Sequence, residues 1–247
     1  MRASTLIAIA ASAATIGLAY ASNTTLIRPD SATAESEFSG SYDIGNAIDG
    51  SGLPVDFTPA DPHATYVVNN HWTTRSNAIP NGTANATFFF DEPQDLGRFY
   101  MWNHRSDGVA SNPFYEVMLF DLIFRDADGV ELYSMTEVPA VGETAVAQTF
   151  CFPEVVGVRS VELRILENQG SIYTGVAEVA FGDASPSKCL GDANFNGTID
   201  LGDLNALLAA FGQPVSPCTP RDTNGDGMLD LADLNYILAN FGNDCPE

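Results

Sequence analysis

Oxygen-bearing side chains recur at a fixed spacing in the last quarter of the chain. The segments 192–212 and 222–242 are offset by 30 residues and are identical at 12 of 21 aligned positions. Each segment opens with Asp or Asn at loop positions 1, 3, 5, 9 and 12. These residues are Asp192, Asn194, Asn196, Asp200 and Asp203 in the first copy, and Asp222, Asn224, Asp226, Asp230 and Asp233 in the second. Calcium takes roughly six to eight oxygen ligands, so the repeat predicts two calcium sites.

Two further features of the repeat fit a loop that wraps a cation. Gly197 and Gly227 stand at position 6, where such a loop turns sharply, and Thr198 and Met228 at position 7 offer backbone carbonyls. Apolar residues at position 8, Ile199 and Leu229, are expected to pack between the paired loops. The alternative is a pair of acidic turns that cap two helices, since aspartate is favourable at a helix N-terminus.

The net charge excludes several classes of partner. The chain has 32 Asp and Glu against 10 Lys and Arg, for a formal charge of −22. Nucleic acid and anionic membrane surfaces would repel it. With 45% hydrophobic residues and 15 Phe, the chain is not wholly disordered. These numbers describe an acidic folded protein that is suited to binding cations.

The N-terminus has the pattern of a secretory signal peptide over residues 1–21. A basic start at Arg2 precedes an apolar run from Leu6 to Ala19 and the small-residue cleavage pattern Ala19-Tyr20-Ala21. The alternative, a membrane anchor, needs about 20 apolar residues, and this run is shorter. We therefore expect a secreted protein, extracellular or at the cell surface, with no membrane insertion after cleavage.

Export permits disulfide bonds among the four cysteines. Cys189, Cys218 and Cys245 lie in the last 59 residues, so a pair within this trio is expected, and Cys189–Cys245 would join the ends of that segment. Cys151 lies in an apolar run and is expected to be a buried free thiol.

A short polar linker, 184–188, separates two regions of different periodicity. Residues 30–183 contain many short runs rich in Val, Phe, Tyr and Ile, with turn signals between them and no long helical pattern. The expected strands are 87–90, 98–103, 115–125, 130–135, 145–152, 158–166 and 175–181. Many short strands of this kind predict an antiparallel β-sandwich of the jelly-roll type.

After the linker, residues 189–247 change to helical spacing. Leu204, Leu207, Leu208 and Phe211 fall on one helix face, and Leu234, Ile237, Leu238 and Phe241 repeat it. Gly212 and Gly242 follow, at positions that favour a left-handed backbone. A loop followed by a helix, duplicated, with Asp at position 12 and no preceding helix, resembles a type I-like dockerin module over about residues 190–245.

The dockerin resemblance implies calcium binding and attachment to a cohesin-bearing scaffold or cell-surface protein. The best-known dockerins carry a Ser-Thr-like pair at positions 10 and 11, which contacts cohesin. This chain has Leu201-Gly202 and Leu231-Ala232 there. The departure leaves the expected calcium ligands unchanged but implies an apolar docking face, which would select a different cohesin or none known.

Several pieces of residues 30–183 resemble the discoidin-like, galactose-binding jelly roll that coagulation-factor C-type domains share with family 32 carbohydrate-binding modules. The pieces, in the family's order, are ATAES at 32–36, NAIDG at 46–50, HWTT at 71–74, FFFD at 88–91 and GVAEV at 175–179. In this family a calcium commonly joins the Asp-Gly loop to a late glutamate. The resemblance therefore implies a third calcium at Ala47, Asp49 and Glu178, although Asp49 can also simply form a turn with Gly50.

An extracellular glycan is the expected ligand of this domain. Sugar binding needs an aromatic ring and polar groups that read hydroxyls. His104, Arg105 and Asn112, at and after the end of an expected strand, are the candidate readers, with Trp72 or Tyr173 as the platform. The alternative is that 104–105 belong to an ordinary solvated loop.

No motif indicates catalysis. The three histidines show no zinc-binding spacing, and neither a nucleophile elbow nor a phosphate-binding loop occurs. We therefore expect a non-catalytic two-module protein that takes part in a polysaccharide-degrading or cell-surface assembly. The alternatives are a structural or adhesion protein whose sandwich binds protein, and a glycoside hydrolase that carries a dockerin.

Overall fold

The computed structural model describes residues 26–105, 114–142, 144–183, 190–194, 196–215, 219–224 and 227–245. The expected signal peptide at 1–21, the linker at 184–188, Asn112, Asp226, Cys189 and Cys218 lie outside these residues, so nothing below tests them. Within the described residues, no helix has the length and hydrophobicity needed to cross a bilayer.

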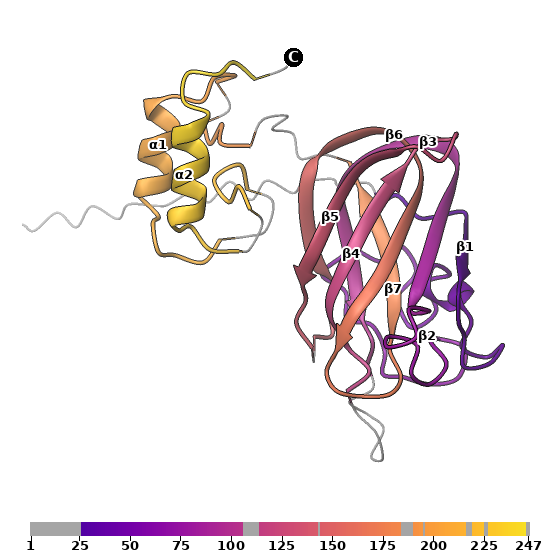
Figure 1. Cartoon of the computed structure of the whole chain (residues 1–247). Helices are drawn as coiled ribbons and strands as arrows, with labels where there is room; N and C mark the ends of the chain where they lie inside the picture. Colours follow the sequence, from indigo (N-terminus) through magenta and orange to yellow (C-terminus); the bar gives the residue numbers. More distant parts are fainter. Residues whose placement is uncertain are drawn as a thin grey trace, which may run out of the picture.

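The first domain is a β-sandwich of seven antiparallel strands (Figure 1). Their bounds are β1 Ser31–Ala34, β2 Trp72–Thr73, β3 Asn85–Asn103, β4 Val117–Arg125, β5 Glu131–Pro139, β6 Gln148–Asn168 and β7 Gly175–Gly182. The helical structure described between residues 30 and 183 is one 3-10 turn, Ile44–Ala47. The sequence-based expectation of a mostly β antiparallel sandwich is therefore confirmed.

Two long strands, β3 and β6, pass from one layer of the sandwich to the other. Residues 85–89 of β3 pair with 160–164 of β6, and residues 98–101 pair with 148–151. Between these stretches the register shifts three times. Such bulges bend a strand and increase its twist. The sequence analysis was therefore wrong to expect two separate strands within each of these segments.

The core lies between the layers and is rich in aromatic side chains. Phe88, Phe120 and Phe124 are completely buried from one layer, and Phe99 and Phe181 from the other. Each such side chain contributes about 1.5–3 kcal/mol relative to an exposed one. The long strands are therefore held in place by burial, which also fixes the loops at their ends.

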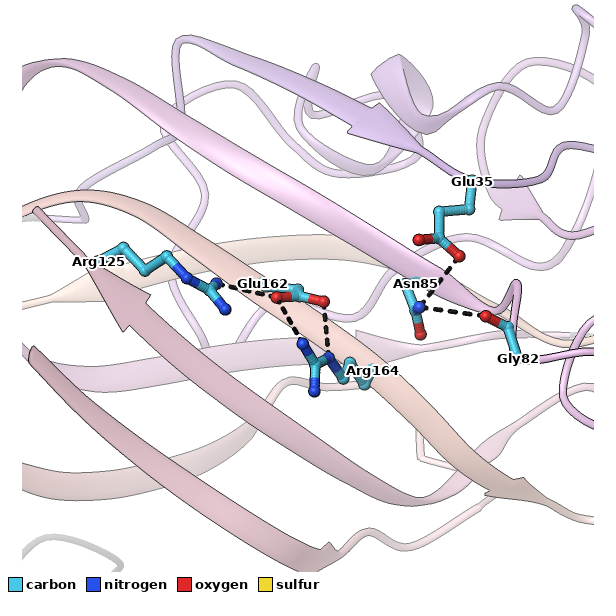
Figure 2. A network of polar contacts seen from close by, with 6 residues as sticks. All are labelled: Glu35, Gly82, Asn85, Arg125, Glu162 and Arg164. Carbon is cyan, nitrogen blue, oxygen red and sulfur yellow. Dashed lines mark hydrogen bonds and ion pairs between the residues drawn. The ribbon is translucent and has the colours of Figure 1, made fainter. Parts of the chain in front are cut away.

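Charged residues cover the outer face of β4 and β6, as the alternation along β6 predicts. Figure 2 shows Glu162 between two arginines. Arg125 Nη1 donates to Glu162 Oε2 at 2.8 Å, and Arg164 donates to both carboxylate oxygens at 2.6 and 3.1 Å. Near the start of β3, Asn85 donates to Glu35 and to the carbonyl of Gly82.

Two short helices, α1 Leu201–Leu208 and α2 Leu231–Ala239, form the C-terminal module. Asp200 and Asp230 cap their N-termini, and Asp203 and Asp233 complete capping boxes by accepting from the backbone of the capping residues. The expected left-handed glycines are confirmed, with φ of 77° at Gly212 and 84° at Gly242, and the position-6 glycines Gly197 and Gly227 also have positive φ, 85° and 80°. The acidic residues thus both start the helices and belong to the predicted loops.

The two repeats exchange backbone hydrogen bonds reciprocally. Ile199 accepts from the N–H of Gly242 at 2.8 Å and donates to the carbonyl of Asn243 at 3.0 Å. Leu229 accepts from Gly212 at 2.7 Å and donates to Gln213 at 3.2 Å. Each position-8 residue therefore pairs with the segment after the other repeat's helix. Both side chains are buried, and their packing between the two loops stays a prediction.

Only part of the apolar face expected on each helix is buried. Leu207 and Ile237 are fully buried, with Leu204 and Leu234 partly buried beside them. The other expected core residues are exposed: Leu208 49%, Phe211 40%, Leu238 53% and Phe241 48%. Helices of eight or nine residues, each with one neighbouring helix, bury a narrow stripe and leave the rest of the apolar face uncovered.

Both described cysteines, Cys151 and Cys245, are in disulfide bonds. The expectation of a free thiol at Cys151 is therefore wrong. Its side chain is half-buried on β6, so it is accessible to a partner, unlike a core cysteine.

Candidate functional site

All three histidines of the chain meet at one end of the sandwich. His63, His71 and His104 are 2%, 0% and 1% exposed. The His63 and His71 ring centroids are 4.8 Å apart, and those of His71 and His104 are 4.7 Å apart. The residues come from the segment before β2, from the start of β2 and from the end of β3. The fold thus joins positions that show no relation in the sequence.

Aromatic rings cover these histidines toward solvent. The half-buried ring of Tyr66 packs on His71 and His104, with centroid distances of 5.4 and 4.8 Å. Tyr115 lies 5.1 Å from His104 and 5.5 Å from Tyr173. Two further rings continue the layer. The aromatic–histidine cluster, as we call it, consists of Phe38, Tyr42, His63, Tyr66, His71, His104, Tyr115 and Tyr173.

Sequence reasoning missed six members of the cluster: Phe38, Tyr42, His63, Tyr66, His71 and Tyr115. Phe38 is 52% exposed, and Tyr42, Tyr66 and Tyr173 are half-buried, so ring faces or edges reach the surface. A phenylalanine among polar residues, outside any expected strand, is a signal that could have identified Phe38. The other positions have no spacing that could have linked them.

Arg105 is bound to the cluster through its backbone and its side chain. Its N–H donates to His71 Nε2 at 3.1 Å, and its carbonyl accepts from the Tyr66 N–H at 2.9 Å. Its Nη1 donates to the carbonyl of His63 at 2.9 Å. The half-buried guanidinium therefore lies beside the aromatic rings, in position to meet a ligand.

Two expected binding residues occupy other environments. Trp72 is fully buried in the core, and its Nε1 donates to the carbonyl of Ser36 at 3.1 Å, so it offers no face to a ligand. His104 is also buried, 3.1 Å from Thr73 Oγ1. The expectation of Trp72 as the platform is therefore corrected, and His104 lies beneath the surface. Tyr173 and Arg105 keep the exposure that a contact residue needs.

Burial controls the charge of the cluster. It lowers the pKa of His71 well below its usual range, and the neighbouring His104, His63 and Arg105 lower it further. Burial also lowers the pKa of His63 and raises that of the Tyr66 phenol. His71 is therefore neutral at physiological pH.

The expected calcium ligands of the sandwich surround a buried carboxyl group. Glu178 is fully buried; its Oε2 accepts from the Gly50 N–H at 2.9 Å, and its Oε1 has no hydrogen bond. Burial raises the pKa of Glu178 to about 8, and the nearby Asp49 raises it too. Such an oxygen, close to Asp49, suits a cation. Ala47, the third expected ligand, is buried at the end of the 3-10 turn.

Sequence reasoning missed Arg28, whose positively charged guanidinium lies beside Glu178. Arg28 Nη2 lies 3.8 Å from Glu178 Oε1 and donates to the carbonyl of Ile48. The same guanidinium lies 5.3 Å from the centre of the Phe57 ring. Arg28 therefore supplies part of the positive charge that Glu178 needs.

The predicted loops of the C-terminal module are built around buried carboxylates. Asp192, Asp203, Asp222 and Asp233 are 4%, 0%, 1% and 0% exposed. Asp203 accepts from the Asn194 and Asp200 N–H groups, and Asp233 from those of Thr223 and Asp230. No arginine in the described part of the chain forms an ion pair with Asp203 or Asp233.

The other predicted ligands line the same loops. Asn196 Nδ2 donates to Asp200 Oδ2 at 3.1 Å, and the Gly197 and Gly227 N–H groups donate to Asp192 and Asp222. Asn194 and Asn224 are exposed, as is Met228 at 40%. In this conformation, no three described acidic, histidine or cysteine side chains converge as a metal site. The buried carboxylates of Asp203 and Asp233 fit a divalent ion chemically, and the two calcium ions stay a prediction.

Several solved structures are similar to the part of this chain that forms the sandwich. They include a fucose-binding module from Streptococcus pneumoniae (17% identity, TM-score 0.45, 65% of this chain and 96% of that one). An F5/8 type C domain from Bacteroides fragilis matches with 17% identity, TM-score 0.47 and 66% and 97% coverage. A family 32 carbohydrate-binding module of NanJ from C. perfringens, in complex with galactose, matches with 16% identity, TM-score 0.42 and 61% and 91% coverage. No family model and no curated protein matches the chain.

Proposed function

We propose that this chain is a secreted, non-catalytic protein whose sandwich binds an extracellular glycan at the aromatic–histidine cluster. The observation that supports this is that Arg105 and the half-buried rings of Tyr66 and Tyr173 all belong to, or are bonded to, one cluster around His71 and His104. Aromatic faces cover the apolar side of a sugar ring, and a guanidinium donates to its hydroxyl groups. Phe38, at 52% exposure, extends the apolar surface beyond one ring.

We further propose that the C-terminal module is dockerin-like, binds two calcium ions and attaches the chain to a cohesin-bearing partner. Its apolar surface supports this. Leu201, Leu208 and Phe211 are exposed in the first repeat (61%, 49% and 40%), and their counterparts Leu231, Leu238 and Phe241 are exposed in the second (65%, 53% and 48%). Large apolar side chains exposed at matching positions of both repeats of a small module favour an interaction surface.

A glycan array with the full mature chain, in calcium, tests the first proposal. Galactose- and fucose-terminated glycans belong among the probes. Arg105→Ala should weaken binding about 10- to 100-fold, because hydrogen bonds to a charged group contribute about 1.5–3 kcal/mol. Arg159→Ala is the matched control, since this half-buried arginine lies on β6 beside Phe89 and Asp126. Binding to no glycan would leave a protein-binding adhesion module as the better description of the sandwich.

Capture by a panel of cohesin domains, with calcium or with chelator, tests the second proposal. We expect capture in calcium only. The double variant Leu201→Asp/Leu231→Asp should abolish it, because a charge cannot be buried in an apolar interface without a partner. Leu132→Asp, at a β5 residue that is 40% exposed, is the control. Capture that is unaffected by the double variant would remove this face from the docking surface.

A further inference from the structure

Asn70, His71 and the backbone N–H of Arg105 are joined by two buried hydrogen bonds, which we call the relay. Asn70 is 4% exposed and His71 is 0% exposed. Asn70 Oδ1 lies 2.6 Å from His71 Nδ1, and His71 Nε2 lies 3.1 Å from the Arg105 N–H. Neither Asn70 nor His71 reaches the surface, so neither can touch a ligand directly.

The orientation of the Asn70 amide is determined by the backbone around it. Its Oδ1 accepts from the Val67 N–H at 2.8 Å, and its Nδ2 donates to the Thr65 carbonyl at 3.0 Å. A flipped amide would place donor against donor and acceptor against acceptor at both contacts. The Asn70 atom that faces His71 is therefore the oxygen.

This orientation selects one form of His71. Because an oxygen faces Nδ1, that nitrogen must carry the hydrogen, and a neutral imidazole carries only one. Nε2 is then a bare acceptor, which is what the Arg105 N–H requires. A hydrogen on Nε2 would turn this contact into a clash of two donors.

We infer that Asn70 and His71 are positioning residues for glycan binding, which hold the chain at Arg105 in place through the neutral, Nδ1-protonated form of His71. The inference rests on the proposed function of the cluster. Four titratable or charged groups surround His71: His63 from the segment before it, Tyr66, and His104 and Arg105 from the end of β3. None of them is a carboxylic acid. Burial and the neighbouring His104, His63 and Arg105 lower the pKa of His71 and outweigh the hydrogen bond with Asn70, which raises it.

The relay has a consequence for pH dependence. With an amide at position 70, glycan binding should change little between about pH 5 and pH 8, because His71 stays neutral.

One experiment tests the relay without any glycan. In uniformly ¹⁵N-labelled full chain, the imidazole nitrogens of His71, assigned by their loss in His71→Gln, should show a bare Nε2 and a protonated Nδ1. The Arg105 amide should exchange slowly with solvent. A bare Nδ1 with a protonated Nε2 would overturn the inference, even if the chain binds glycans.

Two variants of similar volume then connect the relay to binding. His71→Gln can present its amide oxygen to the Arg105 N–H, and His71→Leu cannot. We expect His71→Gln to bind within about threefold of wild type and His71→Leu at least tenfold more weakly, with faster exchange at Arg105. Equal binding by wild type and His71→Leu would overturn the inference. If the wild type binds no glycan, the proposed function fails, and the tautomer and the Arg105 exchange still decide whether the relay exists.

Discussion

Removing calcium should unfold the C-terminal module while leaving the sandwich intact. The perturbation is excess chelator added to the full chain. Asp192, Asp203, Asp222 and Asp233 are the buried carboxylates, and in the described residues α1 and α2 cover only a small apolar core. Without a divalent ion, these charges are compensated mainly by backbone N–H groups, so the folded loops contain strong repulsion.

The repulsion can be estimated from the geometry of a calcium loop. Ligand oxygens lie about 2.3–2.6 Å from the ion, so carboxylates on opposite sides of it are about 5 Å apart. At an effective dielectric constant of about 20, two unit charges at this separation repel by about 3 kcal/mol. Bound calcium reverses this effect. At a free concentration of about 100 times Kd, one site stabilises the folded form by about 2.7 kcal/mol, and two independent sites by about 5 kcal/mol.

Hydrogen exchange measured by mass spectrometry on the full chain is the assay. Protection of the α1 and α2 amides should fall by roughly 100-fold or more in chelator, because a loss of about 2.7 kcal/mol corresponds to a factor of about 100. The β3 and β6 amides should be unchanged. Asp126→Ala serves as a control, since Asp126 accepts from the Asp128 and Val130 N–H groups in an ordinary turn. Its effect should be the same with and without calcium. Equal protection of both helices in calcium and in chelator would refute the reasoning.

Two more predictions follow from single carboxylates. Asp222→Ala should lower calcium-dependent stability more than Asp192→Ala, since the second loop has one more acid in its sequence; calorimetric calcium titration of both variants decides the order. Glu162→Gln should destabilise the sandwich by about 1–2 kcal/mol at neutral pH. Burial raises the pKa of Glu162, but Arg164 and then Arg125 outweigh it and hold the pKa below its ordinary value. The stabilisation is therefore complete above about pH 4.5 and is lost as the pH falls through the lowered pKa. Urea unfolding between about pH 3 and pH 7 should show a smaller difference between wild type and variant at the acidic end; a constant difference would contradict this assignment.

The repeat and the strand pattern could be predicted from the sequence because both depend on the spacing of residues close together in the chain. Glycines at position 6 must adopt a positive φ whatever surrounds them, and Asp200 and Asp230 cap helices through bonds within four residues. Alternation along β6 likewise assigns Glu162 to solvent and Val161 to the core, since successive side chains point to opposite faces.

Contacts between distant segments were decided only by the tertiary structure. His63, His71 and His104 have no common spacing, and they meet because β2 and the end of β3 lie at the same end of the sandwich. Trp72 resembles a sugar platform by residue type, and the pairing of β2 with β7 places it in the core instead.

The same limit applies to the helices. Helical periodicity placed Leu207, Leu208 and Phe211 on one face, but it could not say how wide a stripe the neighbouring helix would cover. The structure buries Leu207 and leaves the other two exposed. Sequence alone therefore determined where this protein turns, caps and alternates. The fold determined which of those residues are buried and which are presented to a partner, because burial depends on what the rest of the chain brings alongside.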